Sequence, residues 1–289
     1  MKIKSIKSLW GMEGSLERQF ELIASTGYDG IESPLPNMIE KFFGFPADEK
    51  LFRRLLEQYE LHYVAMVFTD GINHAQSFSE QVERAADWAP IMINSHSARD
   101  CMTFDEQAEF FDRALTVEQK VGIPVGHETH RGRAMFTPWT TGALLRRFPE
   151  LKLTADFSHW VCVCESLLDD QKDDLELAFK RTIHIHTRVG YAQGPQVPHP
   201  GAPEYSLELS THEHWWKQIA KVHALAGTQL TFTPEFGPPP YMPRIPFRNE
   251  PVADLWQICL WMKERIEKLS NEVFDHPSAS STSDGQLIL

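Results

Sequence analysis

Apolar runs rich in β-branched residues alternate with segments of helical periodicity along the whole of this 289-residue chain. A parallel sheet covered by helices produces such an alternation, because each buried strand is followed by an amphipathic helix. We expect eight strands, near residues 3–10, 30–33, 62–68, 91–95, 123–128, 151–156, 182–186 and 229–235. We expect eight helices, near residues 15–26, 48–60, 76–88, 105–120, 138–148, 166–180, 211–226 and 251–269. A Ser or Thr followed by Glu three residues later predicts helix starts at Ser77, Thr103 and Ser210.

The loops between these units favour a closed barrel over an open sheet. A doubly wound open sheet typically carries a glycine-rich phosphate loop after an early strand. The sequence contains neither GxGxxG nor GxxxxGK followed by Ser or Thr, and its eight units continue without a break in composition. We therefore predict the α/β class and a single (β/α)8 barrel over residues 1–270. Residues 271–289 are polar and are expected to form a flexible tail.

Composition and charge narrow the classes of function. With 42% hydrophobic residues the chain can bury a large core, which excludes disorder of the whole protein. The net charge of −12 disfavours a nucleic acid partner, whose phosphates would be repelled. No stretch approaches the ~20 apolar residues of a membrane span, and the first residues lack a signal-peptide pattern. We therefore expect a cytoplasmic protein whose four cysteines are free thiols.

Four acidic or imidazole side chains fall at the expected carboxyl ends of strands: Glu128, Asp156, His186 and Glu235. In a barrel these ends surround one mouth, so the four side chains should converge. Each alone would be more typical of a helix cap or an ion pair, but burying them together without a cation would be costly. The set predicts one divalent metal ion. Three carboxylates and one imidazole favour Mn²⁺ or Mg²⁺, and Zn²⁺ or Co²⁺ would also bind.

Two segments rich in Gly and Pro, residues 187–209 and 234–246, are expected to form loops at the mouth. His130, Arg131 and Arg188 lie beside the predicted ligands and are candidates for binding a sugar phosphate or sugar acid. The alternative is that they belong to solvated basic loops.

Two further residues are expected inside the barrel. Glu32, in the second strand, is a candidate for contacting a sugar hydroxyl, the alternative being that it supports the strand end. His184 lies two residues before His186 and should face the same interior. It would either support His186 or replace it as the metal ligand.

Several short motifs that contain the candidate site residues resemble the sugar phosphate isomerase/epimerase family, whose members have a xylose isomerase-like TIM barrel. The resemblance covers roughly residues 1–270 and rests on GYDGIE at residues 27–32, the glutamates after strands five and eight, Asp156-Phe157-Ser158-His159 and His184-Ile185-His186. It implies that Glu128 and Glu235 bind the metal and also shuttle protons, and that Asp156 and His186 are ligands only. It implies that His159 contacts the substrate, although a supporting role is the alternative. Ala192 stands where the family's 3-epimerases have an arginine, so the substrate stays open.

The resemblance implies a divalent-metal-dependent isomerase or epimerase acting on a sugar or sugar phosphate. Such an enzyme removes a proton next to a carbonyl and passes through an enediolate. A metal-dependent lyase or dehydratase on an oxidised sugar, inositol or glycoside begins with the same step. An apurinic-site endonuclease is disfavoured, since Phe68-Thr69-Asp70 lacks the histidine expected after the third strand. A non-catalytic sugar-binding barrel and assembly into a homo-oligomer also stay open.

Overall fold

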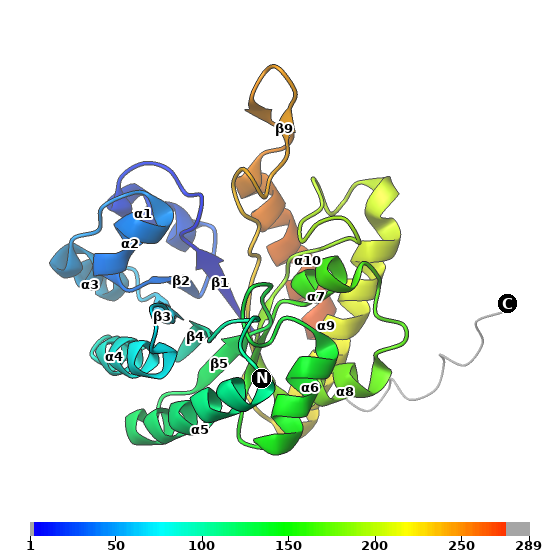
Figure 1. Ribbon diagram of the computed structural model, residues 1–289. Helices are drawn as coiled ribbons and strands as arrows, with labels where there is room; N and C mark the ends of the chain where they lie inside the picture. The colour runs from blue at the N-terminus through cyan, green and yellow to red at the C-terminus, as the bar shows by residue number, and fades with distance from the viewer. Residues whose placement is uncertain (1–2, 276–289) are drawn as a thin grey trace, which may run out of the picture.

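Eight parallel strands form a closed barrel in the computed structural model, which describes residues 3–275 (Figure 1). The strands neighbour one another in chain order, and β8 closes the barrel against β1. The predicted (β/α)8 architecture is therefore confirmed. The strands are β1 (Lys4–Ser8), β2 (Gly30–Pro34), β3 (His62–Phe68), β4 (Met92–His96), β5 (Val125–Glu128), β6 (Leu153–Ala155), β7 (Thr182–His186) and β8 (Thr231–Thr233).

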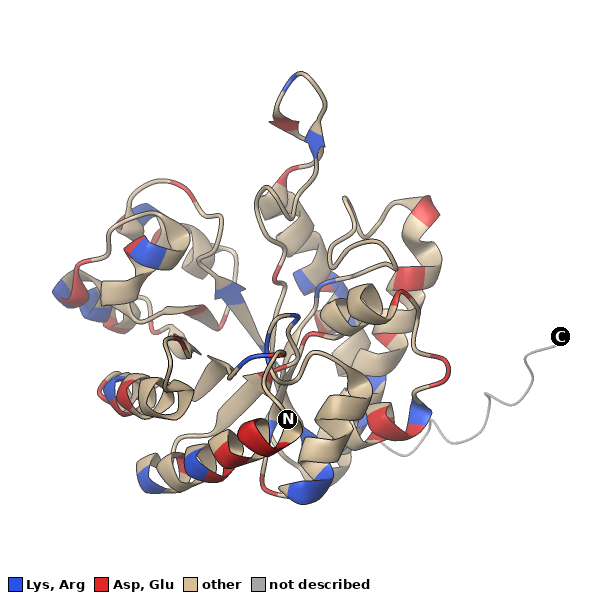
Figure 2. Ribbon diagram, in the orientation of Figure 1, with Lys and Arg blue, Asp and Glu red and all other residues tan. Residues whose placement is uncertain are grey.

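The helices cover the outside of the barrel. They are α1 (Leu16–Ser25), α2 (Pro36–Phe43), α3 (Glu49–Gln58), α4 (His74–Ala86), α5 (Phe104–Val121), α6 (Pro138–Arg147), α7 (Phe157–Cys164), α8 (Lys172–Arg181), α9 (Ser206–Ala226) and α10 (Leu255–Asp275). Acidic and basic residues are interspersed along most of these helices (Figure 2). No helix within residues 3–275 is both long and apolar enough to span a membrane.

Two short helices and one hairpin were among the elements absent from the sequence prediction. Helices α2 and α7 have eight residues each and insert directly after strands β2 and β6. A two-stranded antiparallel hairpin, β9 (Arg244–Ile245) and β10 (Glu250–Pro251), projects from the barrel between β8 and α10 (Figure 1). These insertions lie between a strand and the helix that covers it.

Only one of the three predicted capping boxes is present. Thr103 and Glu106 cap α5 reciprocally. Ser77 and Ser210 lie inside α4 and α9 instead, because these helices begin earlier, at His74 and Ser206.

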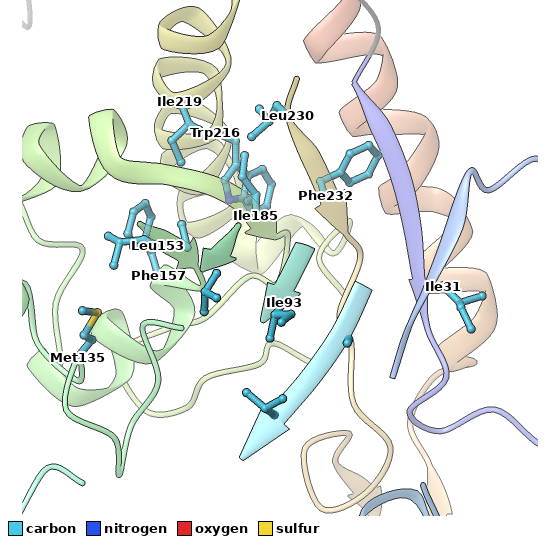
Figure 3. Close-up of a cluster of buried hydrophobic side chains, with 14 of the residues drawn as sticks. Ile31, Ile93, Met135, Leu153, Phe157, Ile185, Trp216, Ile219, Leu230 and Phe232 are labelled. Carbon is cyan, nitrogen blue, oxygen red and sulfur yellow. The ribbon is translucent and has the colours of Figure 1, made fainter. Parts of the chain in front are cut away.

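Side chains along each strand point alternately out of and into the barrel. The outward side chains form the apolar core, and the inward ones form the site. Ile31, Ile93, Leu153, Ile185 and Phe232 project outward from their strands and are fully buried. Figure 3 shows them in one cluster with Trp216 and Ile219 of α9 and Phe157 of α7. Because strand side chains alternate between faces, the neighbours of these residues in sequence point into the barrel. The apolar outer layer thereby fixes which polar residues face the interior.

The end of the barrel differs slightly from the prediction. Helix α10 continues to Asp275, beyond residue 270, and Val273 within it is buried. The remainder of the predicted tail, residues 276–289, lies outside the described residues.

The two predicted loops are shorter than expected, because a 3-10 turn at Pro203–Tyr205 and helix α9 from Ser206 form the end of the first, and β9 begins at Arg244 within the second. The segment of residues 187–202 packs against the segment of residues 234–243. The side chain of Gln196 exchanges two hydrogen bonds with the backbone of Gly237, at 3.1 and 2.7 Å.

Candidate metal centre

The four residues predicted as metal ligands meet at one point inside the barrel. Glu128, Asp156, His186 and Glu235 each offer a ligand atom, and these atoms all lie within 4.8 Å of one another. His186 Nδ1 lies 3.1 Å from Glu235 Oε2, 3.7 Å from Glu128 Oε1 and 4.0 Å from Asp156 Oδ2. All four side chains are buried. The predicted convergence is confirmed, and the imidazole stands between the three carboxylates.

The strand ends set this geometry. Glu128 and His186 are the last residues of β5 and β7, and Asp156 follows β6 directly as the N-cap of α7. Asp156 Oδ1 accepts hydrogen bonds from the backbone N–H and the hydroxyl of Ser158. The cap thus holds the carboxylate in one orientation, with Oδ2 directed to the cluster.

Arg188 brings a positive charge to the same cluster. Its Nη2 contacts Asp156 Oδ2 and lies 3.3 Å from Glu235 Oε2, while its Nε donates to Ser158 Oγ at 3.2 Å. The side chain is 1% exposed, and Nη1 has no hydrogen-bond partner among the described residues. This chain therefore supplies an arginine to the cluster from position 188, two residues after His186. At position 192, where the resemblance led us to look for an arginine, it has alanine.

Behind His186 lies a buried network that the sequence prediction missed. Glu32 Oε1 and Oε2 lie 3.0 and 3.2 Å from His186 Nε2. Asn94 Nδ2 donates to Glu32 Oε1 at 3.0 Å and to Glu128 Oε2 at 2.8 Å. Glu32 is fully buried beneath the cluster, and this burial favours the supporting role over contact with a sugar hydroxyl. It fixes the His186 ring so that Nδ1 faces the carboxylates.

His184 does not replace His186 in the four-residue cluster. Its Nδ1 contacts Thr231 Oγ1 at 2.6 Å, and its Nε2 lies 3.1 Å from Thr233 Oγ1 and 3.6 Å from Glu32 Oε2. Both threonines belong to β8. His184 thus links β7 to β8 below the site.

Burial and mutual repulsion shape the charges of the cluster. Burial raises the pKa of Asp156 to about 6 despite Arg188 and His186, with Glu128 and Glu235 adding repulsion. Burial also opposes ionisation of Glu128, but His96 and His186 hold the pKa of this carboxyl well below its usual range. His186 is buried too, yet Glu235, Glu32 and Glu128 raise its pKa well above the usual value. These three carboxylates thus stabilise the protonated, positively charged form of the His186 imidazole.

A divalent ion fits these donors. Glu128 Oε1 and His186 Nδ1 are buried and make no hydrogen bond of good geometry among the described residues, although His186 Nδ1 lies close to the carboxylates of Glu235 and Glu128. Both atoms belong to the four-residue cluster, in which the positive charges of Arg188 and protonated His186 face three carboxylates. Buried ligand atoms in a cluster with more carboxylates than positive groups form an arrangement that a cation can stabilise.

The cluster opens into a cavity of about 190 Å³. Its polar lining consists of His96, Glu128, His130, Arg188 and Glu235, and its apolar lining of Trp10, Phe42, Phe43, Met66, Phe68 and Tyr241. Aromatic walls beside a charged floor suit a sugar, which has both apolar ring faces and hydroxyl groups. A larger groove of about 880 Å³, between α8 and α9, contains none of the candidate site residues.

The other residues predicted to contact the substrate lie in or near the wall of this cavity. His130 lines it, and its ring lies beside that of His159, tilted by 48° with centroids 3.8 Å apart. His159 Nε2 lies 2.9 Å from Arg188 Nη2, so His159 contacts the arginine directly. The guanidinium carbons of Arg131 and Arg188 lie 5.1 and 5.0 Å from the ring centroid of Tyr241. Arg131 therefore stands beside the cavity, in contact with one of its walls.

Sequence reasoning did not find Asn94 or the wall residues Phe42, Phe43 and Phe68. Phe42 and Phe43 lie on helix α2, which was not predicted, and the Phe42 ring stacks on Phe68 at 4.1 Å. Asn94 occupies an inward position of β4 next to the outward Ile93. Strand alternation was the signal that could have identified it.

Comparison with known proteins gives one family match. The family described as xylose isomerase-like TIM barrel matches residues 20–194. Comparison with curated protein sequences finds no significant match.

Solved structures share the fold at low sequence identity. A D-tagatose 3-epimerase-like protein is 15% identical, with a TM-score of 0.60 over 96% of this chain and 100% of that protein. Mannonate dehydratase from Streptococcus suis serotype 2 is 9% identical, with a TM-score of 0.61 over 99% of both chains. A xylose isomerase-like TIM barrel protein from Mycobacterium smegmatis, in complex with magnesium, is 10% identical, with a TM-score of 0.58 over 94% and 97%.

Proposed function

Because the chain belongs to the xylose isomerase-like TIM barrel family, we propose that it is a divalent-metal-dependent isomerase or epimerase. Its substrate is a sugar or a sugar phosphate, and the reaction removes a proton next to a carbonyl and passes through an enediolate. The observation that carries this proposal is the convergence of Glu128, Asp156, His186 and Glu235, the first and last of which line the cavity.

The same four side chains would hold the ion. A bound divalent cation would polarise the substrate carbonyl and stabilise the negative charge that develops as the proton leaves. Mn²⁺ or Mg²⁺ is favoured because oxygen donors dominate the set.

Glu128 and Glu235 are the proposed proton carriers. They reach the cavity from β5 and from the end of β8, which are separated by β6 and β7 around the barrel. Two carboxylates on different sides of a substrate can remove a proton on one face and return it on the other. The lowered pKa of Glu128 keeps this side chain ionised at neutral pH.

Arg188, His159 and Tyr241 orient the substrate. Arg188 Nη1, buried and unpartnered among the described residues, is available to a substrate oxygen. Its Nη2 is already engaged by Asp156, so the guanidinium is fixed in position. His159 contacts the guanidinium, and the Tyr241 ring packs beside it. The aromatic walls exclude water from the site of proton transfer.

Solvent isotope exchange tests this proposal. Metal-loaded protein is incubated in D₂O with ketoses, sugar phosphates and 3-keto sugars, and label and products are identified by NMR. We expect deuterium at the carbon next to the carbonyl and an isomer or epimer as product. Glu128→Gln and Glu235→Gln should reduce turnover by at least ~10²-fold. Glu109→Gln, an exposed change on α5, is the matched control.

Two results would contradict the proposed chemistry. Exchange at the wild-type rate in both metal-loaded glutamine variants would mean that neither carboxylate is the base. A dehydrated or unsaturated product would identify an elimination, which begins with the same proton removal.

A further inference from the structure

We propose that a small organic anion, with a carboxylate or phosphate group on an apolar body, binds between α1 and the start of α10. The place is a cavity of about 640 Å³ on the outside of the barrel, and Lys7 of β1 is one of its lining residues. The cavity shares no lining residue with the one at the metal cluster. This site therefore goes beyond the proposed function and does not depend on it.

Lys7 occupies a position that other strands give to apolar residues. It pairs in register with Ile31 of β2, whose side chain projects outward. Its neighbour Ile6 packs against Val64 and Met92 on the opposite face of the sheet. The lysine therefore points outward, into the layer between the sheet and the helices. It is only 2% exposed, so its ammonium group does not reach solvent as surface lysines do.

The charge of Lys7 is not balanced by a carboxylate of residues 3–275. Its Nζ donates a hydrogen bond to the carbonyl oxygen of Ser8 at 2.6 Å and lies 5.9 Å from the centre of the Trp256 ring. The lysines that form ion pairs within this part of the chain are Lys41, Lys120 and Lys263. A buried cation without a counter-charge is unfavourable, and an anion bound beside it would stabilise it.

The start of α10 adds a second attraction for an anion. Leu255 and Trp256, the first residues of this 21-residue helix, line the cavity. Their N–H groups have no acceptor within the helix, and the helix dipole places partial positive charge at this end. Asp254 also lines the cavity, but its Oδ1 already accepts a hydrogen bond from the backbone N–H of Gln257 at 3.0 Å. The helix terminus and the buried lysine therefore act on the same space.

The other walls select the body of the ligand. Arg18 and Glu13 are exposed lining residues of opposite charge, which solvent screens. The apolar lining consists mainly of Met12, Leu22, Pro238, Pro239, Met242 and Pro251. A ligand with its anionic group toward Lys7 and an apolar body against these side chains satisfies both parts of the cavity.

Ligand-observed NMR tests this site. The full chain, loaded with Mg²⁺, is titrated with benzoate, with phenyl phosphate and with the neutral analogue benzyl alcohol, and saturation transfer to each probe is measured. We expect saturable binding of at least one anion, and binding of benzyl alcohol that is at least ~10-fold weaker because it lacks the charge. The anion that binds more tightly identifies the ligand group as carboxylate or phosphate.

Two substitutions locate the bound anion. Lys7→Met keeps an unbranched side chain and removes the charge, so the affinity for the anion should fall at least ~10-fold. Ala253→Trp fills the cavity from a half-buried lining position, leaves Lys7 in place and should abolish binding. Lys50→Met, an exposed change on α3, is the matched control and should bind as the wild type does.

Three results would overturn the site. They are the absence of anion binding to the wild type at millimolar concentration, equal affinity for the anions and benzyl alcohol, and wild-type affinity in folded Ala253→Trp. Circular dichroism identifies the folded variants. If Lys7→Met does not fold, the probe comparison in the wild type and the Ala253→Trp variant still decide the outcome.

Discussion

Glu32→Gln tests whether the buried network behind His186 controls metal binding. The substitution preserves side-chain volume and removes one negative charge. Both carboxylate oxygens of Glu32 lie within 3.2 Å of His186 Nε2, so the glutamine oxygen can still accept one hydrogen bond from the ring. The ring therefore keeps its orientation while its basicity falls, because a neutral amide no longer stabilises positive charge on the imidazole.

The expected loss of metal affinity follows from the difference between a carboxylate and a neutral amide at position 32. Removing a carboxylate partner from a metal-binding histidine typically costs 10–100-fold in affinity. Because Glu32→Gln keeps a hydrogen bond, we expect a loss of about 10-fold, which corresponds to ~1.4 kcal/mol. Glu32→Ala removes charge and hydrogen bond together and leaves Asn94 Nδ2 without one of its acceptors. We expect a loss of about 100-fold and a lower free energy of unfolding.

Calorimetric titration of stripped protein with Mn²⁺ measures these affinities, and circular dichroism confirms that each variant is folded. Glu118→Gln is the matched control. Glu118 Oε1 lies 2.9 Å from Nε2 of another buried histidine, His127, whose ring packs against Phe78 and Phe111 away from the cluster. This variant should lose stability and keep its metal affinity. Wild-type affinity in folded Glu32→Gln and Glu32→Ala would refute the orienting role.

Two further predictions concern pH and packing. Because burial raises the pKa of Asp156 to about 6, its contribution to the stability of the metal-free fold is present in acid and lost as pH rises through about 6. Metal binding has the opposite dependence, since protons compete with the ion. The Mn²⁺ affinity should fall at least ~10-fold from pH 7 to pH 5, and a flat profile would contradict ligation by Asp156. In Gly237→Ala the new Cβ would lie 2.2 Å from Trp10 Cη2, so the cavity wall must shift. We expect a free energy of unfolding lower by ~1–3 kcal/mol, measured by urea denaturation; an unchanged value would show that Trp10 can move freely.

The sequence sufficed to predict the strands and the four converging side chains, because both depend on local patterns. Outward residues such as Ile185 and Phe232 identify the buried face of a strand, and the residues between them must face inward. The four candidate ligands lie at or just after strand ends, where a barrel brings all eight strands to one mouth. A one-dimensional pattern therefore determines a three-dimensional cluster once closure is assumed.

The short helices escaped prediction for physical reasons. Helix α7, FSHWVCVC, buries Phe157, Ser158, His159, Trp160 and Val161 in succession, so it lacks the polar face on which helical periodicity depends. Helix α2 has only eight residues, about two turns, which is too short for a reliable period. The stabilisation of both comes from tertiary packing, which a local pattern does not record.

The supporting network could not be predicted because its partners are distant in sequence. Glu32 and Asn94 are 62 residues apart, and Glu32 and His186 are 154 apart. Each looks like an ordinary polar residue of a strand until the barrel closes. Closure of the barrel also changes the interpretation of Glu32. In the sequence its carboxylate is a candidate for sugar binding, whereas in the fold it contacts Nε2 of the His186 imidazole. Residues that touch the substrate can be sought at strand ends, whereas residues that orient them lie one layer deeper, at inward positions of other strands.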